Sequence, residues 1–101
     1  MTTGGKMSFI ERLEAFAKDG HFGMKTRAWM KDVEKLKKDG ITVKHIATFK
    51  EGLISCYIDW SECSVDVEAY IKAPMEIPLN RGNRLWLMAY KAQNPECEIK
   101  I

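Results

Sequence analysis

The sequence predicts an α+β domain in which helices pack on the apolar face of an antiparallel sheet, with elements in the order ααβββαβ. Two runs of alternating apolar and polar residues meet at Glu51-Gly52, which is typical of a β-hairpin. Two segments with helical spacing of apolar residues precede this hairpin, and each ends in an Asp-Gly pair. Apolar residues form 46% and charged residues 30% of the 101 residues, values ordinary for a single globular domain.

The first part of the chain is expected to contain two amphipathic helices. Residues 1–7 are small and polar, so we expect a disordered leader there and the folded domain over residues 8–101. A capping-box pattern begins at Ser8 and predicts a first helix over residues 9–18. The second helix is expected over residues 24–38. An Asp-Gly pair follows each helix, because glycine readily adopts the left-handed conformation that ends a helix.

The hairpin is expected over residues 41–60, where β-branched and aromatic residues are frequent. A two-residue turn at Glu51-Gly52 would pair Phe49 with Ile54 and place the apolar sets of both strands on one face. A three-residue loop would instead pair the apolar set of one strand with the polar set of the other. Since a slip by one residue exchanges the two faces, the two-residue turn is favoured.

Three shorter elements are expected to complete the domain. Alternation over residues 65–72 predicts a third strand, and two prolines bracket the loop that follows. Residues 85–92 are almost wholly apolar, and periodicity alone does not separate a buried helix from a buried strand there. The absence of Val, Ile and Thr favours a helix, with Asn83 as its N-cap. Residues 97–101 alternate again and predict a closing strand.

The composition and motifs favour a cytoplasmic protein without a cofactor. Cys56, Cys63 and Cys97 lack CxxC spacing, which predicts reduced thiols and no metal site. The sequence lacks a signal peptide, a membrane-spanning apolar run, a glycine-rich phosphate loop, GxSxG and HExxH. His45 and Cys56 are expected on the buried face, where a hydrogen-bonded core histidine explains the pair better than a nucleophile and its base. The question of enzyme activity stays open, but no catalytic residues are predicted.

Charge is unevenly distributed and suggests one class of function, nucleic-acid binding. Residues 1–50 carry 11 Lys/Arg and 6 Asp/Glu, whereas residues 51–101 carry 5 and 8. Basic residues recur at helical spacing on the predicted second helix, either as a solvated face or as a ridge that contacts phosphates. With the hairpin after it, this region resembles the later part of a winged helix-turn-helix domain, although the expected preceding helix is absent. The candidate nucleic-acid contacts are Lys25, Arg27, Lys31, Lys35 and Lys38.

The leading hypothesis is a different class, a small non-enzymatic protein-interaction module such as a regulator, inhibitor or adaptor. Aromatic and apolar residues are too numerous for a core of this size, and apolar surface that remains exposed is often an interface with a protein partner or a second copy. Aromatic side chains are also frequent in binding hot spots. The candidate protein interface consists of Lys44, Tyr57, Tyr70, Trp86 and Tyr90.

Overall fold

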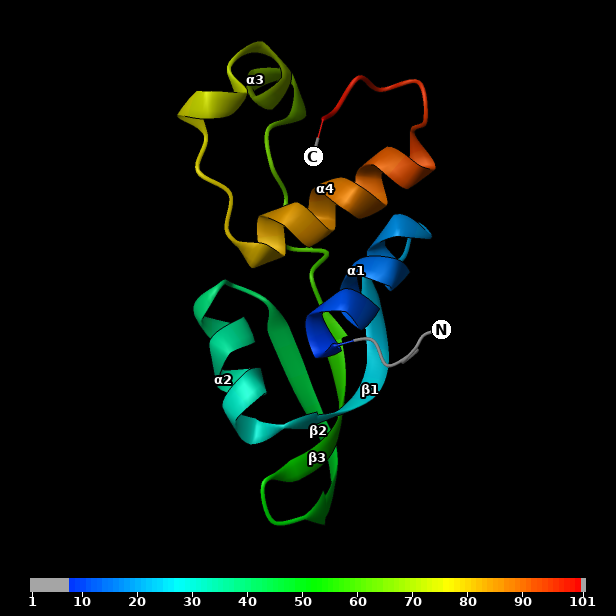
Figure 1. Cartoon of the computed structure of the whole chain (residues 1–101), viewed down its shortest axis with the longest axis vertical. Coiled ribbons are helices and arrows are strands. Elements are labelled where there is room, and N and C mark those ends of the chain that lie inside the picture. The colour runs from blue at the N-terminus through cyan, green and yellow to red at the C-terminus, as the bar shows by residue number, and fades with distance from the viewer. Residues whose placement is uncertain (1–7, 101) are drawn as a thin grey trace, which may run out of the picture.

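The computed structural model describes residues 8–100, so the predicted leader at residues 1–7 and the last residue, Ile101, lie outside the described part (Figure 1). The fold is α+β, as the sequence predicts, but the helices and strands follow the order αβαββαα, with one 3₁₀ turn between the last two helices. The elements are α1 (Phe9–Lys18), β1 (Gly23–Trp29), α2 (Met30–Lys38), β2 (Thr42–Lys50), β3 (Leu53–Asp59), α3 (Val67–Lys72), η1 (Pro74–Glu76) and α4 (Arg81–Gln93).

The three strands form one antiparallel sheet with β3 in the middle. The strand order is β1-β3-β2, so β1 and β2 are both edge strands. Helices α1, α2 and α4 all contribute buried side chains to the main core, which lies on one face of this sheet. The β2–β3 turn projects beyond the helices at one end of the molecule, whereas α3 lies at the other end (Figure 1).

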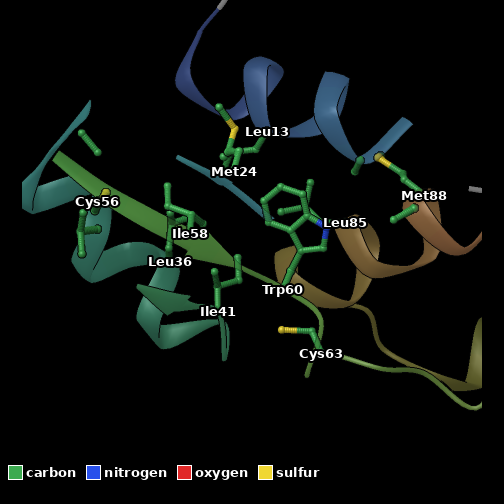
Figure 2. Close-up of a cluster of buried hydrophobic side chains, with 14 of the residues drawn as sticks. Leu13, Met24, Leu36, Ile41, Cys56, Ile58, Trp60, Cys63, Leu85 and Met88 are labelled. Atoms are coloured by element: carbon green, nitrogen blue, oxygen red, sulfur yellow. The ribbon is translucent and has the colours of Figure 1, made fainter. Parts of the chain in front are cut away.

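The indole of Trp60 is fully buried in the main core and joins the sheet to the helices. Trp60 directly follows β3, and its Nε1 donates a hydrogen bond to the backbone carbonyl of His21 at 3.0 Å. Figure 2 shows the ring among Leu13 of α1, Ile58 of β3 and Leu85 of α4. A buried indole needs a partner for its N–H group, so this contact lets a large apolar side chain be buried without an unpaired donor.

Helix α4 lies between two hydrophobic clusters, which explains its almost wholly apolar sequence. Leu85 and Met88 pack into the main core, whereas Leu87 packs with Tyr70 and Ile99 in a second cluster. Leu85 and Leu87 are at most 1% exposed although they are only two positions apart on the helix. Within residues 8–100, no helix is both long enough and apolar enough to cross a membrane.

Several local predictions are confirmed by the cap geometry. The first helix spans the predicted residues, and Ser8 Oγ accepts from Glu11 N at 3.1 Å while Glu11 Oε1 accepts from Ser8 N at 2.9 Å. These hydrogen bonds lower the pKa of the Glu11 carboxyl. The glycines of both Asp-Gly pairs have positive φ, 93° and 80°. The helix predicted over 85–92 is α4, although its N-cap is Asn80, and Asn83 completes a capping box from the third helical position.

The prediction that residues 24–29 begin the second helix is wrong, because they belong to β1. In β1, Met24 and Ala28 are buried while Lys25 and Arg27 are exposed, which is the alternation of a strand. All seven residues of β1 pair with β3. A helix there would leave the backbone groups along that edge of β3 unpaired, so strand pairing prevails over helical spacing. Since β1 separates α1 from α2, the predicted helix-turn-helix resemblance does not hold.

Two predicted strands are absent from the described residues. Most of the segment 65–72 forms α3 instead, because the Asp66 side chain accepts a hydrogen bond from Ala69 N at 3.1 Å and caps a helix. Residues 97–100 form no strand, and Ile99 is buried in the second cluster. Burial in α3 does not follow the alternation in sequence, because Tyr70 is buried and Ile71 is 43% exposed. Near the chain end, Ile99 and Cys97 pack in the second cluster without sheet pairing.

The predicted hairpin forms with the predicted two-residue turn at Glu51-Gly52, but its register changes along the strands. Two irregularities in β2, at Ile46 and Phe49, shift the pairing by two residues in total. Val43 and His45 therefore pair with the core-facing residues Ile58 and Cys56, whereas Ala47 pairs with Ser55 on the opposite face. The predicted apolar set of β2 is thus divided between the two faces, and the individual predicted pairs are wrong. Phe49, predicted to lie on the buried face opposite Ile54, is instead 55% exposed.

Candidate nucleic-acid interface on the open face of the sheet

The face of the sheet that points away from the main core carries only exposed or half-buried side chains in the described part of the chain. It arises because Ile54, Cys56 and Ile58 of the central strand point into the core, so the residues between them point the opposite way. We call this surface the open face. Its side chains form three rows, which contain Lys25, Arg27, Trp29, Lys44, Ala47, Phe49, Lys50, Leu53, Ser55 and Tyr57, and a row at the strand ends that contains Thr42 and Asp59.

Tyr57 lies between two lysines in the first cross-strand row of the open face. The register places Lys25 of β1 on one side of Tyr57 and Lys44 of β2 on the other. The Tyr57 hydroxyl lies over the backbone of Gly23, where a Cβ atom would come within 2.5 Å of it. Glycine at this position therefore lets the ring lie along the sheet with a cation on each side.

The second row contains a guanidinium group packed on an aromatic ring. Arg27 pairs with Ser55, which in turn pairs with Ala47, and these two small side chains leave space above the sheet. The Cζ atom of Arg27 lies 3.7 Å from the centroid of the Phe49 ring. The irregularity in β2 that moves Phe49 out of the predicted register thus brings it to Arg27, where the two groups attract each other.

The third row brings Trp29 to the tip of the hairpin. Trp29 pairs with Leu53, which pairs with Lys50, and Lys50 Nζ lies 5.4 Å from the centre of the indole. A Cβ atom at Gly52 would lie 3.6 Å from the indole, so the ring packs against the turn. Gly52 has a φ of 80°, which the turn requires of it. A hollow of about 360 Å³ beside the ring is lined by Trp29, Met30, Lys31 and Gly52.

The open face carries four cations and one carboxylate, that of Asp59, and none of the four cations forms an ion pair within residues 8–100. The ion pair found in this part of the chain joins Arg81 to Asp39 and lies elsewhere. The nearest carboxylate in the sheet is that of Asp59, whose Oδ1 accepts hydrogen bonds from both the backbone N and the hydroxyl of Ser61. Each of the three rows therefore combines at least one unpaired cation with an aromatic ring.

The structure divides the five predicted nucleic-acid contacts between two surfaces. Lys25 and Arg27 lie on the open face, whereas Lys31, Lys35 and Lys38 are exposed on α2. The continuous helical ridge is therefore not present. Five of the cations and rings on the open face were not among the predicted nucleic-acid contacts, although two of them, Lys44 and Tyr57, belonged to the predicted protein interface. The other three are Trp29, Phe49 and Lys50. The alternation of Lys25 and Arg27 with their less polar neighbours was a weak signal for β1.

The five residues of the predicted protein interface lie in separate places. Lys44 and Tyr57 are neighbours on the open face. Trp86 and Tyr90 are half-buried on α4 and stack on each other with ring centroids 5.0 Å apart. Tyr70 is buried in the second cluster, where its hydroxyl donates a hydrogen bond to a backbone carbonyl at 3.0 Å. No single surface therefore presents all five side chains.

The thiols and histidines do not form a reactive or metal-binding site in the part of the chain described. Cys56 pairs with His45 in the hairpin, but His45 is exposed and contacts Thr48 Oγ1 at 3.1 Å, so the predicted core histidine lies outside the core. Burial raises the pKa of the Cys56 thiol, which opposes its use as a nucleophile. No group of three or more metal-ligating side chains occurs within residues 8–100.

Comparisons with protein-family models, with curated proteins and with solved structures find no match to this chain.

Proposed function

We propose that the protein binds nucleic acid on the open face of its sheet. The observation that carries the proposal is the three successive rows of cations and aromatic rings across a surface whose cations lack acidic partners within residues 8–100. Lysine and arginine bind phosphates, while aromatic and guanidinium planes stack on bases. This proposal keeps Lys25 and Arg27 as contacts and replaces the helical ridge with the sheet.

The aromatic residues argue against an ordinary solvated face. Antiparallel sheets often expose one side to water, but that side is then mostly polar. Here Trp29 is 44%, Phe49 55% and Tyr57 39% exposed, and all three lie on the same face. Exposed apolar surface that gathers in one place usually marks a binding site. The surrounding lysines make an anionic partner the best match.

The proposal is tested by reversing charge on the open face and comparing it with the same change on α2. Lys25→Glu/Lys44→Glu alters the two cations beside Tyr57, whereas Lys35→Glu/Lys38→Glu alters two exposed lysines of α2. Both variants lower the net charge by four, so nonspecific attraction falls equally. Fluorescence anisotropy with a labelled oligonucleotide should show a large loss of affinity for the first variant and a small loss for the second. A larger loss in the α2 variant would overturn the proposal.

Salt dependence gives a second readout of the same contacts. Four phosphate contacts predict a slope of log affinity against log salt of about −3 for a single strand, or roughly 50-fold weaker binding at 200 than at 50 mM salt. Removing two of these contacts should reduce the slope to about −1.4. An unchanged slope in Lys25→Glu/Lys44→Glu would mean that these lysines do not contact phosphates.

We also propose a protein partner at the other end of the molecule, in keeping with an interaction module such as a regulator, inhibitor or adaptor. Met75 of η1 is 96% and Ile71 of α3 43% exposed. A hollow of about 280 Å³ lies beside Ile71 and is bounded by Pro74 and Ile99. A protein captured from nuclease-treated lysate at high salt should be lost with Met75→Asp/Ile71→Asp. If this variant still captured the same protein, the interface would not lie here. If the partner is a second copy of the chain, sedimentation of the purified protein would show self-association.

A further inference from the structure

We infer that the nucleic acid bound by the open face is single-stranded, with unpaired bases stacked on the aromatic rings. This inference rests on the proposed function and specifies its ligand. It follows from how the rings are arranged along the sheet, from the kinds of polar group beside them, and from what a duplex presents to a sheet face.

The aromatic groups form a sequence of stacking positions along the strands. Tyr57 and Trp29 lie in rows four residues apart, which corresponds to roughly 13 Å along the strands. The Arg27–Phe49 pair lies in the row between them. A base can stack on an arginine plane as well as on an aromatic ring, so all three rows offer a surface for a base. Lys25, Lys44 and Lys50 then lie beside the rings, where they can contact the backbone of the same strand.

A duplex does not use this combination of groups. Its bases are stacked on each other inside the helix, and they expose only their edges in the grooves. Base edges are read by arginine, lysine, asparagine, glutamine, serine, threonine or acidic side chains, usually from a helix or a two-stranded ribbon, and aromatic rings are not among the groups that read them. In the middle row the small side chains of Ser55 and Ala47 lie beside Arg27, whose guanidinium packs on Phe49. Phosphate contacts alone would leave the three exposed rings without a role.

The indole of Trp29 makes the stacking directly measurable. The chain has three tryptophans, of which Trp60 is fully buried and Trp86 is half-buried and stacked on Tyr90. Stacking of a base on Trp29 should quench its fluorescence. The variant Trp29→Phe assigns the signal: it should remove the quenching while keeping an aromatic surface, whereas Trp29→Ala removes both.

The experiment compares three ligands of equal length: a single strand, the matched duplex, and a single strand with abasic sites in place of most bases. We expect the intact single strand to bind most tightly and to quench the fluorescence. Trp29→Ala should weaken its binding roughly 5- to 150-fold, the range for losing one stacked base. Phe16→Ala, which removes an exposed ring from α1, is the matched control and should bind normally.

The outcomes separate the ligand class from the proposed function. The duplex or the abasic strand could bind as tightly as the intact single strand, with the salt dependence expected of four phosphate contacts and weaker binding by Lys25→Glu/Lys44→Glu. That result would overturn the single-strand inference and leave nucleic-acid binding intact. Absence of binding to all three ligands at low salt would overturn both. If Trp29→Ala and Phe16→Ala bind the single strand alike, Trp29 is not a stacking position and the inference fails.

Discussion

The two faces of strand β3 are built from alternating residues of one segment but have opposite surroundings. Ile54, Cys56 and Ile58 are at most 4% exposed and pack in the main core with side chains of the helices. Tyr57, which alternates with them, is 39% exposed. One face is therefore covered by apolar side chains of the same chain. The other carries aromatic rings and cations that residues 8–100 leave largely uncovered, so its composition is better explained by a ligand than by folding.

The largest expected effect separates these two faces by stability. Ile58→Ala should lower the free energy of unfolding by about 2–5 kcal/mol, because it leaves a cavity in the main core. Tyr57→Ala, one residue away on the open face, should cost about 1 kcal/mol or less. Urea denaturation of both variants measures the difference. Equal losses would mean that the open face also supports the fold, which would weaken the argument that it is kept for binding.

An intermediate effect is expected where α4 meets the loop after α2. A Cβ atom at Gly82 would lie 2.6 Å from Cys63 Sγ and 2.8 Å from the backbone carbonyl of Asp39. Gly82→Ala should gain about 1 kcal/mol from helix propensity but lose about 1–3 kcal/mol through overpacking. We therefore expect a net loss of stability in thermal or urea denaturation. A more stable variant would show that this contact has room to relax.

The smallest expected effect is a pH dependence caused by the thiol of Cys63. Burial, followed by the nearby carboxylates of Asp59, Glu62 and Asp39, raises the pKa of this thiol in the folded protein. Below the unfolded pKa of about 8.5 both states keep the proton, so this thiol adds no pH dependence. Above it, the unfolded chain loses the proton first, and stability should fall as pH rises through the folded pKa.

Cys63→Ala is the control for this pH dependence. Under reducing conditions, the urea midpoint of the wild-type protein should decline more between pH 7 and 9.5 than that of Cys63→Ala. Identical declines would show that other groups cause the change. Neither protein should change its binding to the open face at pH 7, because Cys63 lies on the buried side of the sheet.

The elements that could be predicted from sequence are those whose signals are local. The capping box at Ser8, the Asp-Gly helix ends and the turn at Glu51-Gly52 depend on a few adjacent residues, and all are confirmed. The helical character of residues 85–92 followed from composition and is also confirmed. The α+β class followed from these elements together.

The parts that could not be predicted depend on partners distant in the chain. Residues 23–29 form a strand because β3 offers an edge some 30 residues later. The alternation around Lys25 and Arg27 is too weak a local signal to outweigh the helical spacing that continues into α2. The position of Phe49 depends on irregular pairing in β2, which the alternation of its sequence does not reveal. The candidate site was therefore predicted only in part: Lys25, Arg27, Lys44 and Tyr57 were identified, but not as one surface.

The most direct test of the open face as the binding site is a nuclear magnetic resonance titration of nitrogen-15-labelled protein with a single-stranded oligonucleotide. The protein has three indole N–H groups, and that of Trp60 is buried and bonded to His21. We predict that the Trp29 indole signal and backbone amides of β1 and β3 shift, while the Trp60 indole and α3 stay unchanged. Shifts confined to α2 around Lys35 and Lys38, or to α3, would contradict the account.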